Sequence, residues 1–535
     1  MRCSAGHHRT DASGPTPPGD RPASPGDRPG AAAPTVSPMS ILALDAGTTG
    51  VTALLVSADL AVIARGYCEF PQHFPADGWV EHDPGEIWAA TLAATRELLA
   101  TPQAAADPPT AVGITNQRES ICFWDRETMG APRRAIVWQD RRTAGICASL
   151  REAGHEPMVE ELTGLRLDPY FSGTKLAWVR LEDRLTWGRV EAGEVAVGTV
   201  DSYLVARLTR GLHHVTDPSN ASRTLLYDLH TGDWSPRLLD LFDVPRTALP
   251  DLVSSYGVIG RTDPSCFLGL DLPIASILGD QQAALFGQGC FAPGSSKCTY
   301  GTGSFVLVNT GEQIVPSRSG LLTTVAWQHP DGRREYALEG AVFVTGAAVQ
   351  WLRDGLQIIA EAAETEALAR SVPDSGGVVF VPALTGLGAP DWDPYARGTI
   401  LGITRGTTRA HLARATLEAI AFEVRDVVDL MTREAALTLP ELSVDGGAAA
   451  NGFLCQVQAD QLGVPVIRSA ELQATGLGAG IAAGIGTGLW ASPDEVGERL
   501  RASAEARFEP GEADPSAHQR WRVAVERSRG WARLR

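Results

Sequence analysis

The sequence is poor in several features that would assign it to a particular class of protein. It has no run of about 18 apolar residues, the length that a membrane-spanning helix requires, and no apolar core of a secretory signal. Its eight cysteines form no Cys-x-x-Cys pair, which argues against a zinc site or a redox dithiol. Its net charge of −17 comes without a dominant basic cluster, so nucleic acid is not an expected partner. We therefore predict a cytoplasmic protein with reduced thiols and no membrane insertion.

Residues 1–38 differ in composition from the rest of the chain. Positions 12–38 are rich in proline, glycine, alanine and serine, and Pro-Gly-Asp-Arg-Pro occurs at both 18–22 and 25–29. Such a segment buries too little apolar surface to offset the entropy lost on ordering, so we expect a disordered extension. Met39 directly precedes the first strand pattern, which leaves open an alternative start of translation and an extension that is not native.

Strand and helix patterns alternate along the rest of the chain. Short apolar runs at 41–45 and 51–56 predict strands, and Asp83 followed by Pro84 predicts the start of a helix over 83–100. Apolar residues with helical spacing predict a long helix over about 409–432. The alternation is typical of α/β proteins. We expect two α/β halves, 39–290 and 291–535, with their boundary near 285–300.

Three glycine-rich turns follow strand patterns, at Asp45–Gly50, Thr299–Gly303 and Asp445–Gly447. Glycine lets the backbone approach a phosphate closely, and backbone N–H groups and threonine hydroxyls can bind its oxygens. One such turn could be purely structural, but three in one chain favour nucleotide binding. The Gly-x-x-x-x-Gly-Lys-Ser/Thr loop is absent, and the small residues of 475–484 only loosely match a dinucleotide motif. We interpret 475–484 as a helix that packs closely on a sheet.

These turns resemble those of the FGGY carbohydrate kinase family, within the actin-like ATPase superfold, over about residues 40–510. The resemblance implies an α/β fold of two actin-like (ribonuclease H-like) ATPase domains with a cleft between them, the second carrying the adenosine loop. It implies ATP and Mg²⁺ as cofactors, with Asp45 near the metal. The nucleotide-binding residues it implies are Thr48, Thr49, Gly50, Thr52, Thr302, Gly346, Gln350, Gly447 and Asn451.

Four further segments, 114–119, 135–139, 168–175 and 279–282, are similar to the polyol pocket of the family's glycerol kinases. A triol needs several donors and acceptors at fixed positions, with apolar surfaces against its C–H edges. The resemblance implies that Trp138 and Phe305 cover the carbon skeleton. It implies that the hydroxyls are bound by Arg118, Glu119, Tyr170, Asp280 and Gln281.

The activity implied is ATP-dependent phosphorylation of glycerol to sn-glycerol 3-phosphate and ADP, with Asp280 as the general base. A homodimer or homotetramer is implied in the same way. Two alternatives stay open: a kinase of another polyol or sugar, and an actin-like ATP-dependent binding protein that transfers no phosphoryl group. Ala46, Gly50 and Thr52 depart from the usual pattern of the family, so the nucleotide end is less closely matched than the polyol end.

Overall fold

The first of two large sheets is built from the N-terminal half of the chain. The computed structural model describes residues 39–471 and 473–534, and the disorder expected for 1–38 lies outside them. The sheet has six strands in the order β13-β14-β5-β1-β2-β3. Its strands are β1 (Ser40–Ala46), β2 (Gly50–Val56), β3 (Val62–Glu69), β5 (Pro109–Asn116), β13 (Tyr256–Arg261) and β14 (Pro273–Gly279). The first three strands form an antiparallel meander, and β5 and β14 run parallel to β1.

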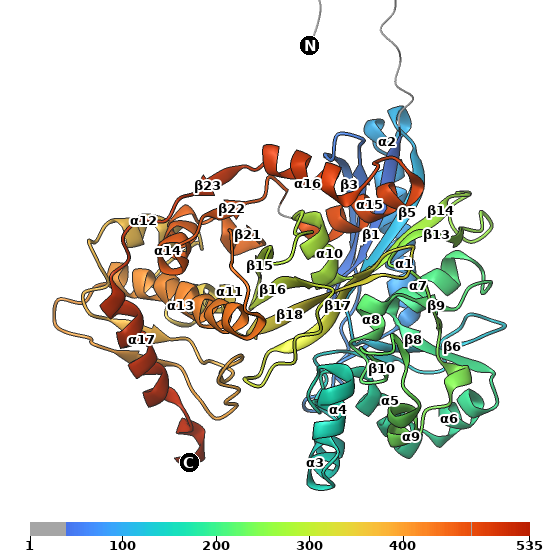
Figure 1. Cartoon of the computed structure of the whole chain (residues 1–535), viewed down its shortest axis with the longest axis horizontal. Helices are drawn as coiled ribbons and strands as arrows, with labels where there is room; N and C mark the ends of the chain where they lie inside the picture. Colours follow the sequence, from blue (N-terminus) through green and yellow to red (C-terminus); the bar gives the residue numbers. More distant parts are fainter. Residues whose placement is uncertain (1–38, 472, 535) are drawn as a thin grey trace, which may run out of the picture. The chain divides into compact units, whose positions relative to one another are not determined.

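The second sheet repeats this arrangement with seven strands in the order β17-β18-β16-β15-β21-β22-β23 (Figure 1). Its strands are β15 (Ser296–Tyr300), β16 (Ser304–Gly311), β17 (Leu322–Gln328), β18 (Arg334–Val342), β21 (Leu442–Asp445), β22 (Val466–Arg468) and β23 (Ala506–Phe508). Here β15 pairs antiparallel with β16 and parallel with β21, as β1 does with β2 and β5. Two α/β halves with the same strand pattern confirm the predicted fold class.

Helices that cover the sheets begin and end close to the predicted positions. The Asp83 side chain accepts a hydrogen bond from the backbone N–H of Gly85, which caps α1 (Pro84–Leu99) as expected. The long helix α13 (Arg409–Ala435) extends three residues beyond its predicted end and buries Ile420, Val424 and Met431. The other helices of eight or more residues are α3 (Ala144–Glu152), α4 (Glu156–Thr163), α5 (Ser172–Glu182), α6 (Arg184–Glu191), α7 (Val200–Leu208), α10 (Asp280–Gly287), α14 (Gly452–Leu462), α15 (Ala474–Thr487), α16 (Pro493–Ala502) and α17 (Pro515–Ser528).

The small residues of 475–484 form most of α15, which packs on the first sheet although it comes late in the chain (Figure 1). A Cβ atom on Gly113 of β5 would lie 2.2 Å from the carbonyl oxygen of Ala479. A Cβ atom on Gly478 would lie 1.8 Å from the carbonyl oxygen of Ala283, in α10. Only glycine fits at these two contacts, so the interpretation of this stretch as a closely packed helix is confirmed.

A smaller sheet, in the order β4-β7-β6-β8, belongs to the first half of the chain, and three predicted polyol residues flank it: Arg118 and Glu119 precede β6, and Trp138 follows β7. Its strands are β4 (Glu81–His82), β6 (Ile121–Asp125), β7 (Ala135–Ile136) and β8 (Val195–Thr199). Phe123, Phe171 and Trp187 lie in its apolar core, so the turns that leave it are held firmly. Among the described residues, no helix is both long and apolar enough to cross a membrane.

Candidate active site

Three of the predicted functional residues lie beyond the carboxyl ends of adjacent parallel strands. Asp45 is near the end of β1, Arg118 follows β5, and Asp280 follows β14. This edge is the usual ligand-binding edge of open α/β sheets. The Arg118 Nε atom lies 2.9 Å from Oδ1 of Asp280, so the predicted base and a predicted hydroxyl ligand are in direct contact.

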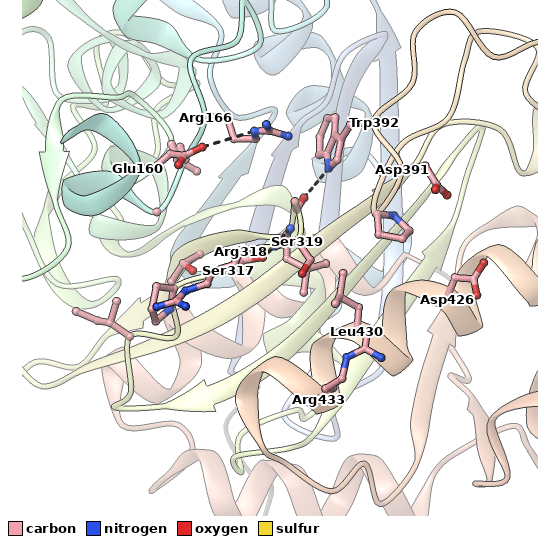
Figure 2. A pocket seen from close by; sticks show the side chains of 18 of the residues that line it. Glu160, Arg166, Ser317, Arg318, Ser319, Asp391, Trp392, Asp426, Leu430 and Arg433 are labelled. Carbon is pink, nitrogen blue, oxygen red and sulfur yellow. Dashed lines mark hydrogen bonds and ion pairs between the residues drawn. The ribbon is translucent and has the colours of Figure 1, made fainter. Parts of the chain in front are cut away.

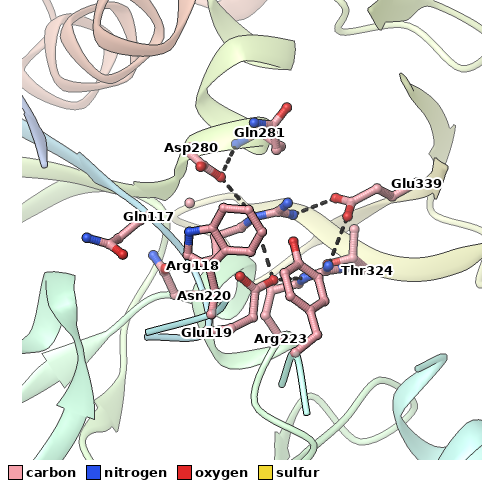
Figure 3. A network of polar contacts seen from close by, with 12 residues as sticks. Gln117, Arg118, Glu119, Asn220, Arg223, Asp280, Gln281, Thr324 and Glu339 are labelled. Atoms are coloured by element: carbon pink, nitrogen blue, oxygen red, sulfur yellow. Dashed lines mark hydrogen bonds and ion pairs between the residues drawn. The ribbon is translucent and has the colours of Figure 1, made fainter. Parts of the chain in front are cut away.

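A chain of buried charges extends from Arg118 away from Asp280 (Figure 3). Arg118 Nη1 lies 2.5 Å from Oε2 of Glu339, and Arg223 Nη2 donates to the other oxygen of Glu339 at 2.9 Å. Arg223 Nε then donates to Glu119 at 2.7 Å. All four of these side chains are at most 2% exposed. The predicted pair Arg118 and Glu119 is therefore held by two residues that the sequence analysis missed.

Arg223 was missed because no motif marks it. Glu339 was missed because it only begins the stretch 339–351, which resembles a nucleotide-contacting segment in which Gly346 and Gln350 were singled out. A charged residue inside an apolar strand pattern, such as Glu339 between Leu338 and Gly340, is the sequence feature that could have indicated a buried functional residue. Burial alone raises the pKa of Glu339, but the charges of Arg118 and Arg223 outweigh it and lower that pKa to about 2. The two guanidinium groups thus favour the anionic form of Glu339.

Trp138 and Tyr170 form an aromatic corner beside these charges. Their rings meet edge to face, with centroids 5.6 Å apart. The Trp138 indole N–H donates to Oγ1 of Thr48 at 2.9 Å, which ties this corner to the first glycine-rich turn. Burial raises the pKa of the Tyr170 hydroxyl well above its usual range, so it stays a neutral hydrogen-bond donor.

The last two predicted polyol residues have different surroundings. Lys297, which is fully buried on β15, donates to Oε1 of Gln281 and to Oγ1 of Thr299, the latter at 3.0 Å. The structure therefore fixes Gln281 through a lysine that the sequence analysis did not single out. Phe305 on β16 packs against an apolar cluster that includes Leu285, and its place in the wall of a polyol pocket stays a prediction.

Thr302 lies on the turn beyond β15, and Gly447 and Asn451 follow β21, the parallel neighbour of β15 in the second sheet. Gly346 and Gln350 begin and end α11 (Gly346–Gln350) after β18, whereas Thr48, Thr49, Gly50 and Thr52 lie on the β1–β2 turn and on β2 of the first sheet. Backbone hydrogen bonds join two of these segments: the N–H of Gly346 donates to Gly301 at 3.0 Å, and the N–H of Thr345 donates to Thr302 at 2.8 Å. Gly346 and Thr302 are thus brought together. Side chains contribute little here, because most of the residues concerned are glycine or exposed. Thr49, Thr302, Gln350 and Gly447 are exposed.

Asn451 and Thr52 have structural roles that the sequence analysis did not anticipate. Oδ1 of Asn451 accepts the N–H of Leu454 at 3.0 Å and so caps α14, while its amide nitrogen donates to Thr365. Thr52 pairs with Asp45 across the β1–β2 ladder. Both residues hold the framework of the turns, and their contact with a nucleotide stays a prediction.

The surroundings of Asp45 fit a loosely held magnesium ion. Burial and the nearby charge of Asp280 raise the pKa of Asp45 to about 7, although Arg65 opposes this. A carboxylate at the end of β1 with a second one close enough to affect its pKa suits Mg²⁺, which is usually bound by one or two carboxylates together with water and phosphate oxygens. In the part of the chain that the structure describes, no group of three or more His, Cys, Asp or Glu side chains could hold a metal ion.

A groove of about 1380 Å³ lies elsewhere in the molecule, between α4 and α13 (Figure 2). Its lining has charges of both signs, including Glu160, Arg166, Asp429 and Arg433. None of the predicted site residues lines it. The size of this groove therefore says nothing about the site at the strand ends.

Known proteins resemble the chain over most of its length. Models of the FGGY family of carbohydrate kinases match the N-terminal domain at residues 40–287 and the C-terminal domain at 296–487. Curated relatives named glycerol kinase, from Aromatoleum aromaticum and Bordetella parapertussis, are 54% and 53% identical, covering 92% of this chain and 99% and 98% of theirs. The crystal structure of Plasmodium falciparum glycerol kinase with ADP matches with a TM-score of 0.86 at 32% identity, covering 92% of this chain and 98% of that one. This chain belongs to the FGGY family of carbohydrate kinases.

Proposed function

We infer that the protein transfers the γ-phosphoryl group of ATP to glycerol, giving sn-glycerol 3-phosphate and ADP. The observation that carries this inference is the contact between Arg118 and Asp280 at the carboxyl ends of β5 and β14, with Glu119 on the same charge chain. These are the residues that the sequence predicts for a polyol pocket. Relatives that share half of the sequence over nearly their whole length are named glycerol kinase.

Asp280 is the residue we assign as the general base. A primary alcohol must lose its proton as its oxygen attacks phosphorus, and a positioned carboxylate that accepts the proton contributes about 10²–10⁴-fold to the rate. Asp280 begins α10, where its Oδ1 accepts the N–H of Gln281 at 2.7 Å. Arg118 contacts the same carboxylate, so its orientation is fixed from two sides.

The hydroxyls of glycerol are assigned to the buried polar groups beside Asp280. Arg118 and Glu119 offer a donor and an acceptor, and Tyr170 and Gln281 offer a phenol and an amide. Trp138 and Phe305 would cover the carbon skeleton. A site of this kind discriminates strongly, because a substrate that lacks a hydroxyl leaves buried polar groups without partners.

The phosphates are assigned to the glycine-rich turns. Backbone N–H groups at Gly50, Thr302 and Gly447 and the hydroxyls of Thr48 and Thr49 would bind phosphate oxygens, with Gly346 and Gln350 near the nucleoside. Asp45 would hold Mg²⁺, which neutralises charge on the phosphates when it is bound. The family's ATP chemistry then needs little from the protein beyond alignment and charge compensation.

Three further expectations accompany this activity. We propose a division into domains at 39–290 and 291–535, because β14 and α10 complete the first half before β15 begins the second. A cytoplasmic location remains a prediction from the scattered cysteines and from the lack of a long apolar run or a secretory signal. A homodimer or homotetramer remains a prediction from the family resemblance. Sedimentation of the purified protein at several concentrations would test the oligomer.

A panel of alcohols in a coupled ADP-release assay tests the activity itself. We expect glycerol to support turnover far better than erythritol, xylulose or 1,2-propanediol, because each of these leaves buried polar groups unpaired or adds a group without a partner. A preference for a sugar would favour a different FGGY activity. ATP hydrolysis that no alcohol stimulates would favour an actin-like binding protein instead.

A further inference from the structure

The charge chain Asp280–Arg118–Glu339–Arg223–Glu119 has its centre on a residue of the second sheet. Glu339 is on β18, whereas Arg118 and Glu119 follow β5 of the first sheet, more than 200 positions earlier. Its two carboxylate oxygens are both used, one by Arg118 and the other by Arg223. One buried anion therefore holds two guanidinium groups at once.

Stabilising the fold does not by itself explain why these charges are buried. Removing the four charged groups of Arg118, Glu119, Arg223 and Glu339 from water carries a large desolvation penalty, and replacing buried ion pairs by apolar residues is often neutral or stabilising. A chain of this kind within the site is better explained by what it positions. Glu119 supports this view, because its backbone has φ +61°, an unusual conformation for a residue other than glycine. Its carbonyl oxygen is held there by Ser172, whose hydroxyl donates to it at 2.9 Å.

The Arg118 guanidinium and the Glu119 carboxylate each keep one atom that can bind a ligand. Arg118 uses Nη1 toward Glu339 and Gln282 and turns Nε toward Asp280. Glu119 uses Oε1 toward Arg223. Within the described residues, Nη2 of Arg118 and Oε2 of Glu119 have no hydrogen-bond partner, so each keeps one atom for a hydroxyl group.

We propose that Glu339 is a positioning residue for the polyol pocket, which orients Arg118 directly and Glu119 through Arg223. This inference rests on the proposed glycerol kinase activity and assigns a role to two residues outside the predicted ligand set. A guanidinium group is a rigid fork, so fixing one nitrogen of Arg118 on Glu339 sets the direction of the others. Without that anchor, the hydroxyl ligands would have to be ordered when glycerol binds, and glycerol affinity would fall.

Substitution E339Q tests this with little change in shape, and E335Q is its matched control. Glu335 is on the same strand, is 8% exposed, and accepts hydrogen bonds from Asn309 and His329 rather than from the site. We expect E339Q to raise the KM for glycerol about 30-fold or more, because one partner of a buried charge pair is removed. The KM for MgATP should change less than threefold, and E335Q should keep both constants near the wild-type values.

Thermal shifts with single ligands separate positioning from simple loss of stability. Glycerol alone should raise the Tm of wild type and E335Q but not of E339Q, while ADP should raise the Tm of all three proteins. A merely structural Glu339 would lower the Tm of E339Q and leave the glycerol KM of the folded enzyme unchanged, and that result would overturn the proposal.

R223K provides a second test if E339Q does not fold. Lysine keeps the charge but cannot bond Glu119 and Glu339 with two nitrogens of one plane. We expect a rise in glycerol KM of about 5- to 10-fold with an unchanged KM for MgATP, and a wild-type glycerol KM would contradict the inference. Absence of glycerol-dependent ADP release in the wild type would instead sink the proposed function itself.

Discussion

The polyol end and the nucleotide end of the proposed site are built from different groups, charged side chains at the first and backbone at the second. At the polyol end, Arg118 and Glu119 are buried and ion-paired, and their partners are fixed in the protein before any substrate is present. At the nucleotide end, the turns at Thr49, Thr302 and Gly447 are exposed and present backbone. Side-chain identity therefore matters at the first end and backbone shape at the second, which explains how Ala46, Gly50 and Thr52 can differ from the family pattern without loss of the turns.

The largest expected effect is at the junction of the two ends. D280N removes the proton acceptor and should lower glycerol-dependent turnover by about 10²–10⁴-fold, because amide is a far weaker base than carboxylate. Binding of ADP, measured by calorimetry, should survive. The control D271N alters an exposed carboxylate paired with Arg261 and should have wild-type activity. Near-normal turnover of D280N would remove Asp280 from the mechanism.

D45N tests the nucleotide end by itself. Loss of one carboxylate should lower kcat/KM for MgATP by about 10- to 100-fold and raise the Mg²⁺ concentration needed for half-maximal rate. The glycerol-induced rise in Tm should be unchanged, because among the described residues the Asp45 side chain makes no hydrogen bond or ion pair with the charge chain. D59N, at an exposed turn that follows β2, is the control. An equal loss of glycerol-induced stabilisation in D45N would mean that the two ends are not separable.

Protonation of His82 would disturb the hydrogen bonds that hold the first glycine-rich turn, so His82 makes the stability of the protein depend on pH. Its ring contacts the Oε1 atom of Gln72 at 2.6 Å and the Nε2 atom of Gln117 at 3.2 Å, and these two amides donate to the carbonyl oxygens of Thr48 and Gly47. Burial, assisted by the charge of His73, lowers the pKa of His82 to about 4. A protonated ring would turn an N–H toward the Gln117 amide donor, so the network requires the neutral form.

The sign of the pH effect follows from that pKa. The unfolded state takes up the proton near pH 6.5 and the folded state only near pH 4, so stability falls as pH drops through this window. Between pH 7 and pH 5 we expect His82 to account for a loss of about 2 kcal/mol in the free energy of unfolding. Urea denaturation of wild type and H82Q at both pH values measures it. A wild-type slope in H82Q would assign the loss to other groups, such as the buried His214, whose pKa is also lowered to about 4.

Features that depend on neighbouring residues could be predicted from the sequence, whereas contacts between residues far apart in the sequence could not. The β1–β2 hairpin and its turn at Asp45 follow from local apolar runs and glycines, and the cap at Asp83 from two adjacent residues. The tight packing of 475–484 was also predictable, but not that its partner would be the first sheet. The roles of Arg223 and Glu339 could not be predicted, because they come from contacts that only the folded chain creates: Glu339 with Arg118, and Arg223 with Glu119 and Glu339.

The smallest expected effect tests a side-chain hydrogen bond that joins the polyol end to the first glycine-rich turn. W138F keeps an apolar ring beside Tyr170 but loses the indole N–H that donates to Thr48. One neutral hydrogen bond is worth about 1 kcal/mol, so we expect the KM for MgATP to rise about 2- to 5-fold and the KM for glycerol to change less.

T48V removes the same bond from the other side and makes a double-mutant cycle possible. If Trp138 acts on the nucleotide turn through Thr48, the double variant W138F/T48V should be no worse than the poorer single variant, because the bond can be lost only once. Effects on MgATP that add fully would show that Trp138 reaches the nucleotide end by another route. A larger effect of W138F on glycerol than on MgATP would place Trp138 wholly at the polyol end, and Lys297, which donates to both Gln281 and Thr299, would remain as a side-chain link between the two ends.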